Sequence, residues 1–277
     1  MPYEEWIGRT ETRHDQVTPW PLEALAATLD RDDPPPRAGD PVPPLWHWLY
    51  FLPTERQSEL GPDGHPRRGG FLPPIDLPRR MWAGSRFEFH HPLRVGQEIT
   101  RLSRIVSVQE KRGRSGALVF VVVRHEVSSP AGLALTEEHD IVYRDLSKTA
   151  DRASVEHEVC ATWERTIRPD DVLLFRYSAL TFNGHRIHYD RRYCTETEGY
   201  PGLVVHGPLI ATLLLDLLRR NMPDAVVTRF QFRAVSPLFD TAPFTVCGAT
   251  EGDSVNLWAK QASGGLAMTA SASLAPR

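Results

Sequence analysis

The hydrophobic and polar positions of this chain predict mainly short β-strands. Three strand-like runs occur at residues 98–109, 117–128 and 133–143, and three more at residues 244–250, 254–261 and 266–274. They are rich in β-branched residues and bounded by Gly, Pro, Asp or Ser, which is typical of strands in an antiparallel sheet. Residues 267–274 alternate loosely between apolar and polar positions. Residues 117–123 are continuously apolar, which indicates a more deeply buried strand.

Longer apolar segments precede the strands in each half. The clearest predicts a helix over residues 207–220, with a proline at its second position and two arginines at its end, where cations suit the helix dipole. It is apolar nearly all round, so we expect it to be buried. Its counterpart in the first half is the shorter segment 45–52, and residues 20–29 read as another short helix. Residues 53–74, with five prolines and four glycines, predict a long ordered loop.

The chain repeats a short pattern at half-length spacing. Residues 85–96 and 228–240 both contain Arg-Phe-x-Phe followed by Pro-Leu, and three predicted strands follow each copy. This favours a duplication over one large mixed domain with a chance repeat. One buried helix followed by four or more antiparallel strands in each half is the hot-dog arrangement. We therefore predict an α+β double hot-dog fold with domains 1–148 and 149–277, joined by a linker near residues 145–152.

Composition excludes several classes of protein. The 277 residues, 41% hydrophobic and 24% charged, are ordinary for a soluble globular protein of two domains. A net charge of −3 without a clustered basic excess argues against nucleic-acid binding. No apolar run approaches the ~20 residues that span a bilayer, and the acidic start is not a signal peptide. Three widely spaced cysteines indicate a reducing cytoplasm rather than a disulfide framework or a structural zinc site.

Two segments concentrate reactive side chains. Residues 182–190 read F-N-G-H-R-I-H-Y-D and contain an amide, two imidazoles, a guanidinium, a phenol and a carboxylate. About twenty residues later, a His-Gly-Pro turn opens the predicted buried helix. The first segment can hold and activate a water molecule. The second offers free backbone N–H groups at a helix start, which suit a developing negative charge. Together they predict an enzyme that acts on a carbonyl or thioester.

Residues 175–188 resemble the hydratase motif of MaoC-like enzymes, whose usual form is an aromatic, a small residue and then Gly-Asp-x-Asn-Pro-x-His. Residues 204–209 resemble the start of their central helix. The variant Asn-x-His-x-x-His-Tyr-Asp is typical of the hydroxyacyl-thioester dehydratase type 2 branch. Residues 6–12, 44–53 and 69–84 resemble segments of its relatives, the mesaconyl-C(4)-CoA hydratases.

The resemblance covers nearly the whole chain and implies a hydro-lyase. Such an enzyme reversibly hydrates an α,β-unsaturated acyl-CoA thioester to a 3-hydroxyacyl-CoA. Mesaconyl-C(4)-CoA or a related branched dicarboxylic enoyl-CoA is the implied substrate. The N-terminal half would lack the catalytic motif and shape the acyl pocket.

The resemblance also implies roles for single residues. His188 occupies the position of the catalytic histidine, and imidazole exchanges protons near neutral pH. Asn183 stands where the common motif has aspartate. Because an amide is no Brønsted base, we expect Asn183 to orient the water, to shape a turn, or both. The Gly207 N–H is expected to point at the thioester oxygen, a plain helix start being the alternative.

Substrate contacts are predicted for His206, Arg186, Tyr189 and His185. Arg186 could pair with a substrate carboxylate or belong to the charged surface. No third ligand at a recognisable spacing accompanies His185 and His188, so we predict no metal, and no cofactor, since coenzyme A is part of the substrate. A homodimer is possible. A hot-dog thioesterase, a non-catalytic acyl-CoA-binding subunit and a 3-hydroxyacyl-ACP dehydratase stay open as alternatives.

Overall fold

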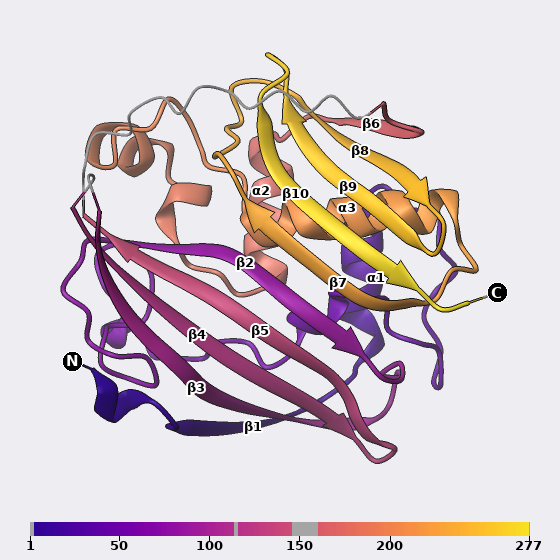
Figure 1. The fold of residues 1–277 in the computed structure, drawn as a ribbon, viewed down its shortest axis with the longest axis horizontal. Helices are drawn as coiled ribbons and strands as arrows, with labels where there is room; N and C mark the ends of the chain where they lie inside the picture. The colour runs from indigo at the N-terminus through magenta and orange to yellow at the C-terminus, as the bar shows by residue number, and fades with distance from the viewer. Residues whose placement is uncertain (1–2, 114–115, 146–159, 277) are drawn as a thin grey trace.

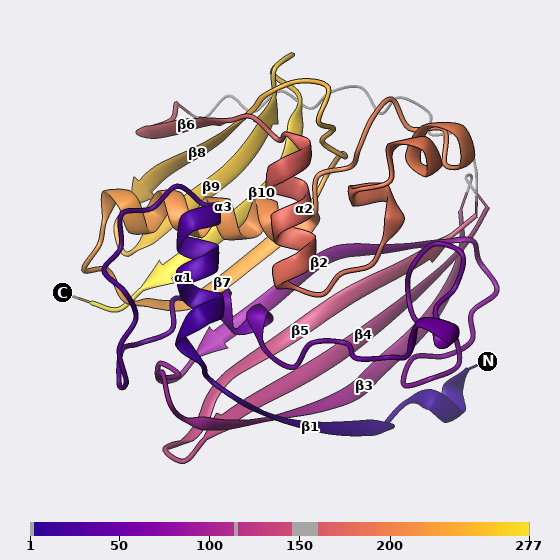
Figure 2. The same cartoon turned by 180° about the vertical axis from the view of Figure 1, so that it is seen from behind.

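The computed structural model describes residues 3–113, 116–145 and 160–276. Within these residues, ten antiparallel strands form one curved sheet, with helices on its concave side (Figures 1 and 2). The predicted linker and the boundary at 148/149 fall on residues 146–159, outside the described residues. No described helix is long and apolar enough to cross a membrane.

The two halves of the sheet have the same strand order. In the N-terminal half the order is β1-β3-β4-β5-β2, and in the C-terminal half, counted from its outer edge, it is β6-β8-β9-β10-β7. Each N-terminal strand therefore corresponds to the C-terminal strand whose number is five higher. The bounds are β1 (Thr10–Gln16), β2 (Arg79–Phe89), β3 (Glu98–Gly113), β4 (Gly116–Ser129), β5 (Gly132–Arg144), β6 (Trp163–Ile167), β7 (Val227–Ala234), β8 (Phe244–Glu251), β9 (Ser254–Gln261) and β10 (Leu266–Leu274). The six predicted strands are confirmed, and the matching order supports the predicted duplication.

The seam between the halves is built from the repeated sequence itself. β2 pairs with β7, and Phe87 lies opposite Phe230, so the two Arg-Phe-x-Phe copies run antiparallel against each other. Their rings lie 6.0 Å apart in the core. Both copies place their first phenylalanine on the same face of the sheet. The two halves therefore join in one continuous sheet, and the two rings pack in the same apolar core.

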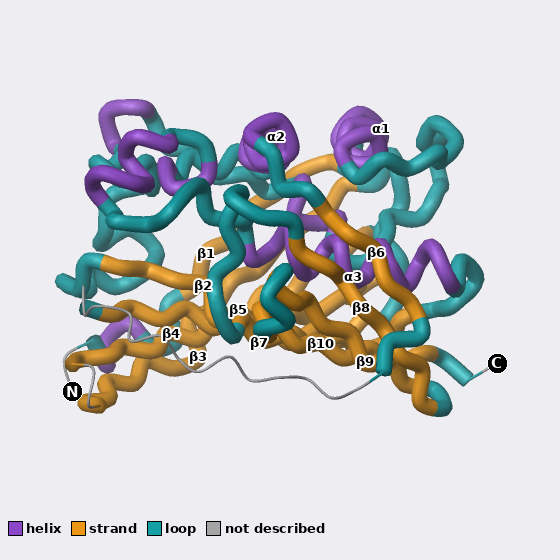
Figure 3. Tube along the Cα trace, turned by 90° about the horizontal axis from the view of Figure 1, so that it is seen from above, coloured by secondary structure: helices purple, strands orange, loops and turns teal. Residues whose placement is uncertain are grey.

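Three α-helices are described: α1 (Pro19–Thr28), α2 (Asp171–Leu180) and α3 (Gly207–Asn221). α3 is buried against the C-terminal half of the sheet, as predicted, and α1 and α2 form the outer layer (Figure 3). α2, which the sequence patterns did not predict, is capped by Asp170, whose carboxylate accepts the N–H of Leu173 at 2.8 Å. Short turns complete the fold: η1 (Glu4–Trp6), η2 (Trp46–Leu49), η3 (Gln57–Glu59), η4 (Arg186–His188) and the single π-helical turn η5 (Tyr193–Thr197).

The predicted helix over 45–52 is reduced to the single turn η2. Left-handed backbone at Leu45 (φ 70°) and Phe51 (φ 57°) bounds this turn on both sides, so a regular helix cannot extend there. Among the described residues of the N-terminal half, no helix corresponds to α3, which fills the concave face of the C-terminal half. The prediction of one buried helix in each half was wrong in this respect, and the difference leaves room for a cleft beside η2.

Candidate active site

A cleft of about 2970 Å³ lies between the two halves, and both line it. From the C-terminal half come the predicted residues Asn183, His185, Arg186, His188, Tyr189 and Gly207. The N-terminal half contributes the turn around His65, Arg80 of β2, and His139 and Tyr143 of β5. Six of the seven predicted site residues therefore share one cavity.

His188 is held uncharged at the end of η4. Its Nδ1 lies 2.7 Å from the carbonyl oxygen of Val204, which can only accept, so Nδ1 carries the proton and Nε2 keeps its lone pair. The side chain is 7% exposed. Burial lowers the pKa of His188 to about 4, although the bond to Val204 acts in the opposite direction. At neutral pH the imidazole is therefore uncharged and able to accept a proton.

His206 lies behind His188 rather than on the cleft wall. The two rings stack with centroids 3.7 Å apart, and His206 Nε2 lies 2.8 Å from the hydroxyl of Ser178. His206 is 1% exposed. Burial, followed by the nearby His188 and His185, keeps the pKa of His206 well below its usual value. This position suits support of the His188 ring, and it does not favour the direct substrate contact that we predicted.

Gly207 opens α3 and lines the same cleft as His188. As the first helical residue, it has no acceptor for its N–H within the helix. A methyl group on its Cα would meet no atom within 4 Å, so the cleft is open beside this backbone. The contact with a thioester oxygen stays a prediction, and the arrangement leaves space for it.

Asn183 shapes the turn that follows α2. Its N–H donates to the carbonyl of Ser178 at 2.8 Å, and its Oδ1 accepts the N–H of His185 at 3.0 Å. This is the turn role that an Asn-Gly pair predicts. The amide nitrogen and one lone pair of Oδ1 stay available to bind water, and the water-orienting role of Asn183 stays a prediction.

Arg186 and Tyr189 brace the motif. The Arg186 guanidinium donates to Asp190 at 3.0 and 2.7 Å and to the carbonyl of Pro62 at 3.0 Å, and it lies 4.1 Å from the centre of the Tyr193 ring. These contacts use three of the five N–H donors of the guanidinium, and the predicted pairing of Arg186 with a substrate carboxylate stays a prediction. The Tyr189 hydroxyl donates to the Gly184 carbonyl at 2.9 Å, and its role in substrate binding stays a prediction.

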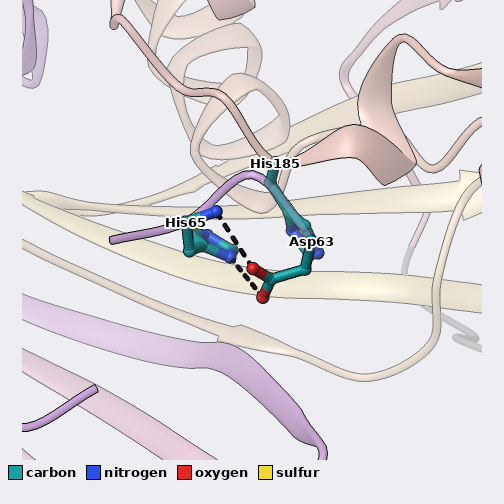
Figure 4. A group of neighbouring side chains, drawn as sticks. All are labelled: Asp63, His65 and His185. Atoms are coloured by element: carbon teal, nitrogen blue, oxygen red, sulfur yellow. Dashed lines mark hydrogen bonds and ion pairs between the residues drawn. The ribbon is translucent and has the colours of Figure 1, made fainter. Parts of the chain in front are cut away.

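A turn of the N-terminal half reaches this motif, and the sequence patterns did not single it out. Asp63 and His65 lie beside His185, and the rings of His65 and His185 are 4.1 Å apart (Figure 4). The donor atoms of all three residues lie within 4.8 Å of one another, close enough to hold a metal ion. Because the Asp63 carboxylate and the Nδ1 of His65 already satisfy each other at 3.1 Å, the arrangement favours a hydrogen-bonded pair. The signal that could have found them is the long ordered loop over 53–74, since such loops commonly carry functional residues.

Comparisons with known proteins agree with this geometry. The family model for hydroxyacyl-thioester dehydratase type 2 matches residues 45–240. The chain is 48% identical over 274 residues to the mesaconyl-C(4)-CoA hydratase of Chloroflexus aurantiacus, covering 97% of this chain and 96% of the relative.

The chain belongs to the hydroxyacyl-thioester dehydratase type 2 family.

Solved structures extend the family assignment to the fold. HtdX of Mycobacterium tuberculosis superposes with a TM-score of 0.68 at 19% identity, covering 95% of this chain and 99% of that one. Another M. tuberculosis protein, described as having a double hot-dog fold, gives a TM-score of 0.60 at 12% identity, covering 97% and 96%. The predicted α+β double hot-dog fold is confirmed, with the N-terminal helix shortened to η2.

Proposed function

We propose that this member of the hydroxyacyl-thioester dehydratase type 2 family reversibly hydrates an α,β-unsaturated acyl-CoA thioester to a 3-hydroxyacyl-CoA. One observation supports the proposal most. The buried, neutral His188 and the first N–H of α3, at Gly207, open onto one cleft in a chain that is 48% identical to a hydratase. A base and a carbonyl-oxygen donor in one cavity are what addition to an enoyl thioester requires.

The proposed reaction needs one base and one donor. His188 Nε2 takes a proton from water while the water oxygen bonds to the β-carbon. The electron pair of the double bond moves toward the thioester, whose oxygen gains charge opposite the Gly207 N–H. The His188 imidazolium then returns the proton to the α-carbon. One such N–H donor stabilises the charge by about 3–4 kcal/mol. Coenzyme A arrives as part of the substrate, and the scheme uses no further cofactor.

The proposed substrate is mesaconyl-C(4)-CoA or a related branched dicarboxylic enoyl-CoA, in line with the closely similar relative. Its second carboxylate needs a cation, and Arg186 is already paired with Asp190. Arg80 lines the cleft from β2 and is hydrogen-bonded to Tyr143. Within the described residues no carboxylate pairs with Arg80, so its guanidinium suits the substrate carboxylate.

The test compares purified wild-type protein and His188→Ala with mesaconyl-C(4)-CoA. We expect loss of enoyl absorbance and a product heavier by one water, with turnover lowered at least ~100-fold in the variant. Wild-type turnover in a folded His188→Ala protein would contradict the role of His188. Release of free thiol would instead indicate a thioesterase, and binding without turnover a non-catalytic subunit. Turnover of the acyl-carrier-protein ester in preference to the CoA ester would indicate the dehydratase alternative.

We also propose a cytoplasmic homodimer. Cys160, Cys194 and Cys247 are free thiols, which suits a reducing compartment. Fractionation of cells and light scattering of the purified protein test the two parts separately.

A further inference from the structure

The turn formed by residues 61–65 of the N-terminal half is seated on the catalytic motif. It closes through Gly61 N–H to the His65 carbonyl at 2.7 Å, and the N–H of Arg186 donates to the Asp63 carbonyl at 2.9 Å. A methyl group on Gly64 would lie 1.9 Å from the Gly184 carbonyl oxygen. Only glycine permits so close an approach of two backbones, so the sequence of both segments suits this contact.

At this turn, Asp63 fixes the tautomer of His65. The carboxylate accepts the backbone N–H and the ring Nδ1 of His65, each at 3.1 Å (Figure 4). Burial raises the pKa of Asp63, but the bonds and charge interaction with His65 outweigh it and lower that pKa below its usual value. An ionised carboxylate can only accept, so Nδ1 carries the proton and the Nε2 of His65 keeps a lone pair.

His65 lies where it can face the reacting water. It lines the cleft with Asn183 and His188, and its ring contacts that of His185, which in turn lies 5.3 Å from the His188 ring. The charged and titratable groups that face His65 are Asp63, Arg68, Arg80, His185 and His188. Burial, followed by Arg80, lowers the pKa of His65, so the imidazole is neutral at neutral pH.

The motif itself is poorer in acceptors for the water than the common one. Asn183 replaces the aspartate of the common MaoC-like motif, so one amide oxygen stands in place of two carboxylate oxygens, and one of its two lone pairs already accepts the His185 N–H at 3.0 Å. A water aligned for attack has two protons, one for His188 and one that stays in the product. The second proton needs an acceptor, and the Asn183 amide nitrogen cannot serve.

We propose that His65 is a catalytic residue whose Nε2 accepts the hydrogen bond from this second proton, and that Asp63 is its positioning residue. The N-terminal half thus supplies the acceptor that the common motif carries as aspartate. In the step itself, one water proton passes to His188 Nε2 as the oxygen bonds to the β-carbon. The other proton stays on the oxygen as the product hydroxyl, so no net proton moves to His65. The inference rests on the proposed hydratase function.

The first experiment compares His65→Ala, Asp63→Asn and the control Asp76→Asn, an exposed residue of the same connecting segment. We expect kcat to fall about 10-fold or more in the first two, with KM within about threefold of wild type, and no change in the control. In Asp63→Asn, the amide can donate to Nδ1, which would move the ring proton to Nε2 and remove the acceptor. Nitrogen-15 NMR of the histidine rings reports this tautomer change without substrate.

The second experiment places Asn183→Asp in the His65→Ala background. A carboxylate at the position of the common motif should recover part of the lost kcat, which a purely structural role of His65 would not allow. A wild-type kcat in His65→Ala overturns the proposal. A fall in kcat that comes with a raised KM, and that Asn183→Asp does not relieve, also overturns it. An active wild type with unaffected variants rejects only this inference, whereas a wild type inactive on every enoyl-CoA rejects the proposed function as well.

Discussion

Gly64→Ala tests whether the turn at 61–65 belongs to the active site. The added methyl group would lie 1.9 Å from the Gly184 carbonyl oxygen, where ordinary contacts begin near 3.4 Å. The turn must therefore shift by more than about 1 Å, which is enough to break hydrogen bonds and to misplace a reacting group. Gly64 also has φ +87°, a conformation that costs an alanine about 1–2 kcal/mol.

The control for this variant is Gly69→Ala in the same loop. Gly69 has φ +89°, but a methyl group there would meet Pro74 at an ordinary 3.6 Å. Both variants carry the backbone strain, and only Gly64→Ala displaces the turn from the motif. The difference in kcat between the two variants therefore reports the effect of moving Asp63 and His65 away from the motif.

The assay follows enoyl absorbance and thermal unfolding in parallel. We expect Gly64→Ala to lose about 10-fold or more in kcat relative to Gly69→Ala, because a shift of this size misplaces His65. The melting temperatures of the two variants should differ by only a few degrees, since the turn can lift without disturbing the sheet. Equal kcat values in the two variants would refute the reasoning that the turn positions a reacting group.

Other features of the cleft give three further predictions. Gly207→Ala should fold with an unchanged melting temperature, because its methyl group meets no atom within 4 Å, yet lower kcat/KM by crowding the thioester. Unchanged kinetics would contradict a thioester bound against this backbone. Arg80→Met should lower kcat/KM for a dicarboxylic enoyl-CoA by about 10-fold or more, as expected for a lost ion pair, and leave crotonyl-CoA hydration unaffected. An equal loss on both substrates would count against a carboxylate site. Burial foremost lowers the pKa of His188 and His125 to about 4 and that of His139 to about 3, against about 6.5 when unfolded. The unfolded chain therefore binds more protons below pH 6.5, and stability should fall as pH drops from 6.5 toward 4, by up to about 1.4 kcal/mol per pH unit for each histidine. Urea unfolding at pH 7.5 and 5 checks this, and equal stability at both would contradict it.

The sequence alone determined the features that depend on neighbouring residues. The strands at 244–250, 254–261 and 266–274 agree with β8, β9 and β10 within a residue, because period-two patterning and turn residues act locally. The helix at 207–220 was also predictable, since an apolar run with a proline near its start and arginines at its end has few alternatives. The motif at 182–190 was also recognisable from adjacent residues, whereas its position beside the helix start was implied only by the family resemblance.

Only the tertiary structure decided how these pieces combine. Pairing of β2 with β7 joins the halves, and the turn at Asp63 and His65 crosses from one half to the motif of the other. The tertiary structure also places His206 behind His188 and pairs Arg186 with Asp190. Such contacts join residues far apart in the chain, and side-chain packing selects them. A sequence pattern fixes which face a residue takes within its own element, but not which distant element covers that face.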